Sequence, residues 1–166
     1  FVEAGLQDAC VLYMVDPEVI TACHKAGLGA TLTMDVGAKS TLLQGDPVAM
    51  TFQVMGLSDG AFRYGGDMYS GLKGNMGPSA YIRQNGIHVI LATVREQPFD
   101  TAFSETLGLE PRKMSYIGVK SAAHFRAGFE DWVGAVYVVA EPSLHDSNNV
   151  NFRRLGRQLY PIHDRE

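Results

Sequence analysis

Apolar and polar residues form two different patterns along this chain, and the first pattern predicts a strand followed by a helix. Asp8 to Val15 is a near-continuous apolar run of strand length, as expected when both faces of a strand are covered. Asp16-Pro17-Glu18 then predicts a helix start, with Asp16 as its cap and Gly27 as its end. The chain therefore opens with a strand and a helix.

The second pattern, from about residue 30 to residue 94, is typical of antiparallel strands. The predicted strands are Thr31 to Val36, Val48 to Met55, Ala61 to Tyr64, Ser79 to Arg83 and Ile87 to Val94. Asn85-Gly86 between the last two is a strong signal for a two-residue hairpin. The five glycines between Gly65 and Gly77 predict a surface loop or lid.

Alternating strands and helices return after this hairpin. Asp100 is predicted to cap a short helix through Phe103 to Leu107. The later predictions are a buried strand at Met114 to Val119, a helix from Ser121 to about Val133, and a final core strand at Ala135 to Ala140. The pattern predicts an α/β fold, with a mixed β-sheet, flanking helices, parallel crossovers and an antiparallel β-rich insertion.

Composition narrows the class of protein. A chain of 166 residues with 46% hydrophobic and 19% charged residues fits one globular domain over residues 1–166. The net charge of -4 argues against nucleic acid as the main partner, and no apolar run reaches the roughly 18 residues of a membrane helix. Cys10 and Cys23 match no metal or redox spacing, so we expect reduced, buried thiols, compatible with a cytoplasmic protein. The start at Phe1 suggests a fragment of a longer protein.

The run from Val119 to Arg126 contains three candidate functional residues, at the point where a predicted strand is followed by a predicted helix. Lys120 supplies a cation, Ser121 a hydroxyl that could cap the helix, and His124 an imidazole in its first turn. A helix N-terminus favours an anion or a developing oxyanion, and it also favours neutral over protonated histidine. The alternative interpretation is a solvated lysine, a helix cap and a packed histidine.

Further cations extend this predicted site. Arg95 and Lys120 both follow strands of the crossover set, so they should share one sheet edge, where they could hold a carboxylate or phosphate. Each could instead pair with an acid such as Glu96 or Asp100. Lys39 lies in a glycine turn that lacks the glycines of a phosphate-binding loop, but it could still face a shared cleft. The five histidines include no pair at metal-ligand spacing.

Ordered motifs over nearly the whole chain resemble the C-terminal domain of the microcystinase C, or MlrC-like, family of bacterial metallopeptidases. They are Asp16-Pro17-Glu18, Ala26-Gly27-Leu28-Gly29, Gly37-Ala38-Lys39, Ser58-Asp59-Gly60-Ala61-Phe62, Thr93-Val94-Arg95-Glu96-Gln97, Val119-Lys120-Ser121, His124-Phe125-Arg126 and Tyr160-Pro161. The resemblance implies a zinc-dependent hydrolase of amide bonds in linearised cyclic or other small peptides. It also implies that the zinc ligands belong to a preceding N-terminal domain, so none is assigned to this chain.

The resulting hypothesis is that this chain completes the substrate cleft opposite a zinc site in that N-terminal domain. His124 and Lys120 are the predicted catalytic residues, which orient a substrate carboxylate or stabilise an oxyanion. The predicted substrate-binding residues are Ser121, Arg95, Arg126 and Lys39. The alternative hypothesis is a noncatalytic binding or assembly domain for an anionic small molecule or a partner protein. The oligomeric state is left open.

Overall fold

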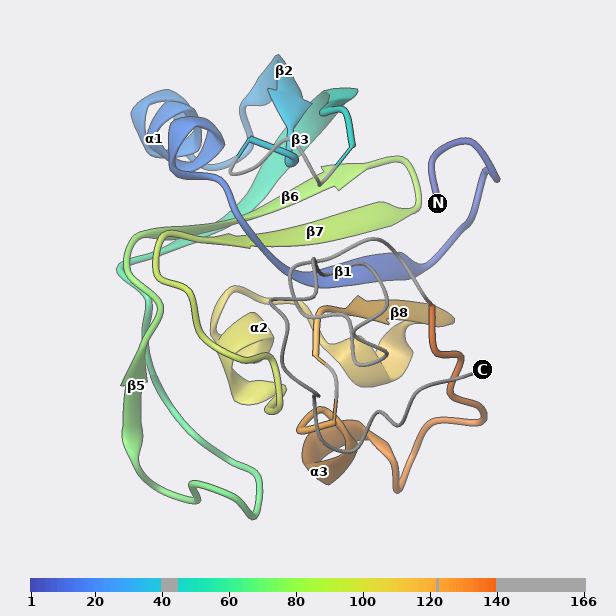
Figure 1. Ribbon diagram of the computed structural model, residues 1–166. Helices are drawn as coiled ribbons and strands as arrows, with labels where there is room; N and C mark the ends of the chain where they lie inside the picture. The colour runs from blue at the N-terminus through green and yellow to red at the C-terminus, as the bar shows by residue number, and fades with distance from the viewer. Residues whose placement is uncertain (40–44, 122, 140–166) are drawn as a thin grey trace, which may run out of the picture.

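A mixed β-sheet forms the centre of the structure, a computed structural model that describes residues 1–39, 45–121 and 123–139 (Figure 1). Within these ranges the large sheet has six strands in the order β2-β3-β6-β7-β1-β8. Their bounds are β1 (Ala9–Val15), β2 (Thr31–Val36), β3 (Val48–Ser58), β6 (Ser79–Gln84), β7 (Ile87–Ala92) and β8 (Tyr116–Val119). A separate antiparallel pair joins β4 (Ala61–Arg63) to β5 (Lys73–Asn75).

Parallel pairing is confined to one side of the large sheet. Strand β1 pairs in parallel with both β7 and β8, whereas β2, β3, β6 and β7 pair antiparallel with their neighbours in that order. All six residues of β7 are buried, as expected for a strand covered on both faces. The predicted α/β fold with parallel crossovers and an antiparallel insertion is therefore confirmed.

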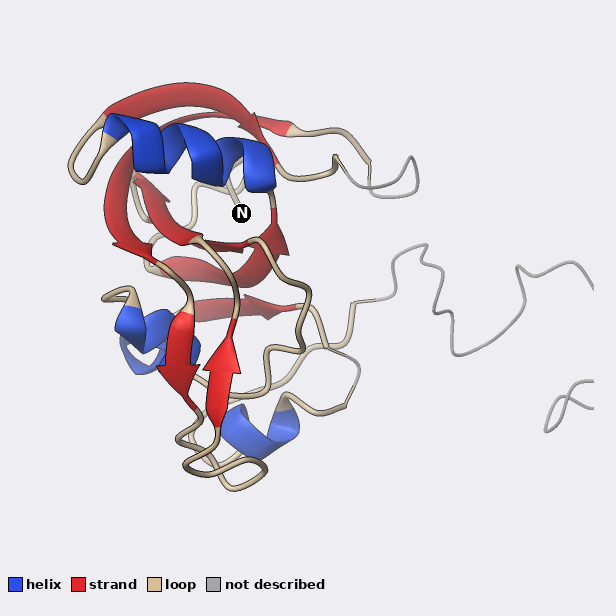
Figure 2. Cartoon of the chain, turned by 90° about the vertical axis from the view of Figure 1, so that its left-hand side faces the viewer, coloured by secondary structure: helices blue, strands red, loops and turns tan. Residues whose placement is uncertain are grey.

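Helices cover both faces of the sheet. Helix α1 (Pro17–Ala26) packs Val19, Ile20 and Cys23 against one face. The other face is covered by β4, α2 (Ala102–Thr106) and α3 (Arg126–Phe129), with Phe103 and Phe129 among the buried residues. A short 3₁₀ turn, η2 (Pro111–Lys113), precedes β8. Figure 2 shows the curved sheet between α1 on one side and the small β4–β5 pair with the two short helices on the other.

Several local predictions hold in detail. The Asp16 side chain accepts a hydrogen bond from Val19 N at the start of α1, and Gly27 ends that helix with a positive φ of 86°. Both cysteines are buried and free, as predicted. No helix among the described residues has the length and hydrophobicity needed to cross a membrane.

The β6–β7 hairpin has the predicted two-residue loop, and Asn85 there has a φ of 52°. We expect Asn85→Ala to lower the free energy of unfolding by about 1 kcal/mol, because alanine pays a steric cost in the left-handed region that asparagine largely avoids. Asn85→Gly is the matched control and should be nearly neutral, since glycine adopts this conformation freely. Urea unfolding of both variants measures the difference, and equal losses would contradict this explanation.

The helix predicted from Ser121 to about Val133 is wrong in its extent. Helix α3 covers only Arg126–Phe129, and its boundary residue Phe125 makes no capping bond with its side chain. Ser121 Oγ accepts a hydrogen bond from Phe125 N at 3.2 Å, so it closes a turn before the helix. Gly128 explains part of the difference. Glycine weakens helices, and a Cβ at this position would collide with the Phe99 carbonyl oxygen.

The final core strand predicted at Ala135 to Ala140 is also wrong over its described part. Residues 135–139 form no strand, and the side chains of Tyr137 and Val139 are 87% and 74% exposed. Within the described residues no strand of the large sheet lies beyond β8, so this apolar segment is not part of the sheet. Ala140 itself, like Tyr160-Pro161, is outside the described residues.

The glycine-rich segment between Gly65 and Gly77 contains regular structure, whereas a surface loop or lid was predicted. It contains β5, which pairs with β4. Gly74 in β5 packs directly against the Phe62 ring, where a larger residue would collide with that ring. At the other end of the segment, Gly65 N and Gly66 N donate to the Asp100 carboxylate at 2.9 and 2.7 Å. The segment is therefore tied to the body at both ends.

Candidate functional site

Three chain segments leave the sheet at the same edge. Strands β1, β7 and β8 are mutually parallel, so their carboxyl ends point the same way (Figure 1). Asp16 follows β1, Arg95 follows β7 and Lys120 follows β8. The pairing thus brings Arg95 and Lys120 to one edge, as predicted. In α/β sheets, ligands usually bind at the carboxyl ends of strands.

His124 reaches across this edge to the segment that follows β7. Its Nδ1 is hydrogen-bonded to Oε1 of Gln97. Because an amide oxygen only accepts, Nδ1 carries a proton in this arrangement, and in the neutral imidazole the free lone pair is on Nε2. His124 is exposed, so Nε2 can be reached by a ligand. His124 was predicted in the first turn of a helix. It lies instead in the turn that precedes α3.

Two cations follow the strands at this same sheet edge. Lys120 and Arg95 are exposed, and neither forms an ion pair with another described residue. The alternative in which they pair with Glu96 or Asp100 is therefore not observed. Ser121 is partly buried and occupied by its bond to Phe125 N, so its hydroxyl is directed to the turn.

Arg126 is engaged on its own helix. Its Nη1 contacts Glu130 Oε1 at 2.6 Å, four residues along α3, and its guanidinium lies 5.4 Å from the centre of the Phe125 ring. The pair is exposed, so it contributes little to stability and could be exchanged for a ligand at small cost. Arg126 therefore remains a predicted substrate-binding residue without a contact that supports the role.

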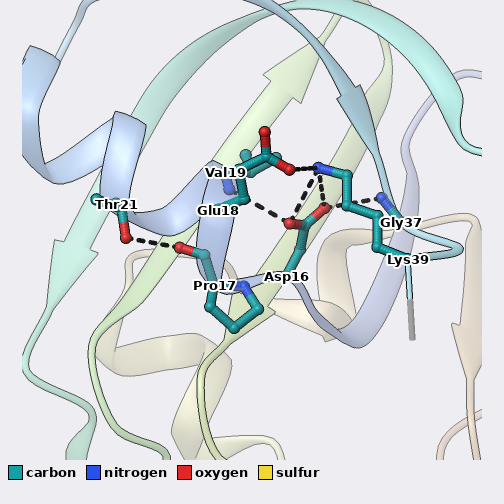
Figure 3. Close-up of polar contacts among 7 residues, drawn as sticks. All are labelled: Asp16, Pro17, Glu18, Val19, Thr21, Gly37 and Lys39. Carbon is teal, nitrogen blue, oxygen red and sulfur yellow. Dashed lines mark hydrogen bonds and ion pairs between the residues drawn. The ribbon is translucent and has the colours of Figure 1, made fainter.

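Lys39 is held by two acids that follow β1, as Figure 3 shows. Its Nζ lies 3.2 Å from Asp16 Oδ2 and 2.9 Å from Glu18 Oε2. Asp16 is 1% exposed, and its Oδ2 also accepts from Gly37 N at 2.9 Å. One buried carboxylate thus caps α1 and fixes the turn that carries Lys39. No hydrogen bond or ion pair joins Lys39 to His124 or Lys120 within the described residues.

The charge of Lys39 is stabilised by these neighbours. Partial burial lowers the pKa of the Lys39 ammonium, but hydrogen bonds and charges from Glu18 and Asp16 outweigh that effect and raise the pKa overall. Lys39 stays protonated wherever the fold is intact at neutral pH. Its ion pairs leave less of its charge for a substrate than Lys120 offers.

A small pocket, which the sequence did not predict, lies beside the segment that follows β7. Tyr13, Tyr64, Glu96, Gln97 and Asp100 are among its lining residues. The Tyr13 hydroxyl is hydrogen-bonded to the backbone of Glu96, which holds this segment against β1. Phe62, Glu96 and Gln97 fell within recognised motifs, and no sequence signal linked those motifs to Tyr13 or Tyr64.

The described residues contain no group of three or more His, Cys, Asp or Glu side chains that could hold a metal ion. His24 is bonded through Nε2 to the Ser79 carbonyl oxygen at 3.1 Å, and His88 through Nδ1 to the Tyr81 hydroxyl at 2.5 Å. Burial, and then the nearby Arg83, lower the pKa of His88, which fits a neutral structural imidazole. His145 and His163 are outside the described residues. The part of the chain seen here does not fit a zinc site.

Comparisons with known proteins agree with this fold. The chain is 27% identical over 157 residues to microcystinase C from Sphingomonas sp., a match that covers 95% of this chain and 30% of the relative. The crystal structure of a proposed metallopeptidase from Mesorhizobium sp. BNC1 superposes with a TM-score of 0.78 at 23% identity, covering 95% of this chain and 32% of that one. The chain thus spans about a third of the length of these relatives. Residues 1–154 match the family model described as MlrC C-terminus, and the chain belongs to that family.

Proposed function

We propose that this chain is the part of an MlrC-like metallopeptidase that completes the substrate cleft for hydrolysis of amide bonds in small or linearised cyclic peptides. The observation that carries the proposal is the contact between His124 and Gln97 at the sheet edge where Lys120 forms no ion pair with another described residue. Family membership supports the reaction class.

The residues at this sheet edge have different roles in the proposed reaction. Gln97 accepts from His124 Nδ1, so in the neutral imidazole Nε2 is the nitrogen that accepts a hydrogen bond or a proton from the reacting groups. Lys120 and Arg95 supply positive charge for a substrate carboxylate or for an oxyanion. A helix N-terminus contributes nothing at Ser121, because α3 begins five residues later and has only four residues.

Zinc, in this proposal, is bound by a separate N-terminal domain of a longer protein. The relatives are about three times the length of this chain, and this difference supports a separate domain. We place the protein in the cytoplasm, which suits its two unpaired cysteines. The proposed partners are that domain and a small peptide substrate.

Lys120→Ala in a longer protein that includes the N-terminal domain tests the role of this edge. We expect kcat/KM for a small peptide to fall about tenfold, because an exposed cation that pairs with substrate charge contributes on this scale. Metal content should not change. Lys113→Ala is the matched control, since Lys113 is an exposed lysine already paired with Glu110 at 2.8 Å. Equal kcat/KM values for the two variants would remove Lys120 from the site.

A further inference from the structure

The small pocket beside the candidate site has a chemistry opposite to that of the cationic edge. Its volume is about 20 Å³, which accommodates one water-sized group. Aromatic rings form much of its wall, including those of Tyr13, Phe62 and Tyr64. Glu96 and Asp100 are its only charged lining residues among those described, and both are acids. Rings and carboxylates together favour a cation.

Tyr64 is one of the residues that line this pocket. The side chain is only 9% exposed, and its hydroxyl makes no hydrogen bond with any described residue. No fully enclosed polar atom of a described side chain lacks a partner, so the Tyr64 hydroxyl has access to solvent. A ligand that reaches this hydroxyl meets a phenol oxygen with free lone pairs.

The potential at this hydroxyl is negative. Burial raises the pKa of Tyr64, and the charges of Glu96 and then Asp100 raise it further. The same acids that disfavour a phenolate favour a bound cation. Burial, opposed by a backbone hydrogen bond at Glu96, also raises the pKa of Tyr13 to about 12, so both phenols stay neutral and can accept or donate hydrogen bonds.

The two carboxylates have different parts. Asp100 already accepts from Gly65 N and Gly66 N through Oδ2, and from Ala102 N through Oδ1 at 2.8 Å. It acts as a fixed charge that shapes the pocket. Glu96 is exposed, and the only hydrogen bond of its side chain to a described residue is from Gln97 N to Oε1 at 3.1 Å, so its other carboxylate oxygen is open to a ligand.

We propose that this pocket binds a primary ammonium group, with Glu96 as its counter-ion, the Tyr64 hydroxyl as an acceptor and aromatic faces as its walls. An ammonium group is the size of a water molecule and donates three hydrogen bonds, whereas a guanidinium group is too large for the cavity. The pocket adjoins Gln97, which holds His124. If the proposed peptidase function holds, the ligand is the amino terminus or a lysine side chain of the peptide substrate.

Titration of this 166-residue chain with methylammonium chloride tests the pocket without reference to hydrolysis. We expect saturable changes in the ¹⁵N–¹H signals of Gly65 and Gly66, at constant ionic strength, and no such changes with sodium acetate or guanidinium chloride. Glu96→Gln should weaken binding about tenfold. Glu105→Gln, an exposed acid on α2 that does not line the pocket, is the matched control and should bind as the parent chain does. Tyr64→Phe should weaken binding a few-fold.

Absence of saturable shifts with methylammonium, or an equal effect of Glu96→Gln and Glu105→Gln, would overturn the proposed pocket. Failure of Lys120→Ala to affect turnover would instead count against the proposed peptidase role and leave the amine site standing. In the longer protein, peptides acetylated at the amino terminus or at lysine separate the two sources. Only the acetylation that removes the bound ammonium should raise KM, and it should do so in the parent protein but not in Glu96→Gln.

Discussion

His124→Ala, in a longer protein that includes the N-terminal domain, is expected to lower kcat/KM for a small peptide by about a hundredfold, with metal content unchanged. This is the lower end of the range for the loss of a residue that transfers or accepts a proton in the transition state. The free energy of unfolding should change by less than about 0.5 kcal/mol, because His124 is exposed and its one side-chain bond is to Gln97.

Two further variants separate a chemical role from a structural one. Gln97→Ala leaves the imidazole of His124 but removes the acceptor that fixes its tautomer. We therefore expect a smaller loss of kcat/KM than in His124→Ala, and a change in the pH profile of kcat/KM. His24→Ala is the matched control. It removes an exposed histidine from α1, on the opposite face of the sheet, and should leave kcat/KM within about twofold of the parent. Unchanged turnover in His124→Ala would exclude the proposed role of His124.

Asp16→Ala is expected to cause the largest loss of stability, about 3 kcal/mol. The substitution removes the cap of α1 at Val19 N, leaves the buried Gly37 N without its acceptor, and takes away one of the two partners of Lys39. Urea unfolding should show the loss as a lower midpoint with an unchanged slope.

Glu18→Gln is the control for the charge of this cluster. The Glu18 side chain is 69% exposed, so removal of its ion pair with Lys39 should cost less than about 0.5 kcal/mol. Asp16→Asn should fall between the two variants, because it keeps an oxygen for the cap but loses the charge. If Asp16→Ala is no less stable than Glu18→Gln, the network drawn in Figure 3 does not stabilise the fold.

Local chemistry was readable from the sequence wherever neighbouring residues decide the structure. Asp16-Pro17 starts α1, and Asn85-Gly86 forms the hairpin, because each signal acts over a few residues. The parallel order of β1, β7 and β8 was implied by strands that alternate with helices. That order was enough to predict Arg95 and Lys120 at one sheet edge.

Features that depend on distant parts of the chain were not predictable in the same way. Gly128 reads as a weak helix residue, but its close approach to Phe99 is visible only in the packed structure. Residues 135–139 have the apolar composition of a core strand, yet composition does not supply a neighbouring strand. The pairing of Gln97 with His124 and of Asp16 with Lys39 likewise needed the topology of the sheet.

The position of β1 between β7 and β8 also has a consequence for the order of folding. Ala9 pairs with Ile87 and with Tyr116, so β1 has no strand partner among the described residues until the β6–β7 hairpin has been synthesised. During that interval the apolar length of β1 depends on α1 or on chaperones for protection from aggregation. The edge that carries the candidate site therefore forms only after β7 and β8 have been synthesised, from segments that are far apart in the sequence.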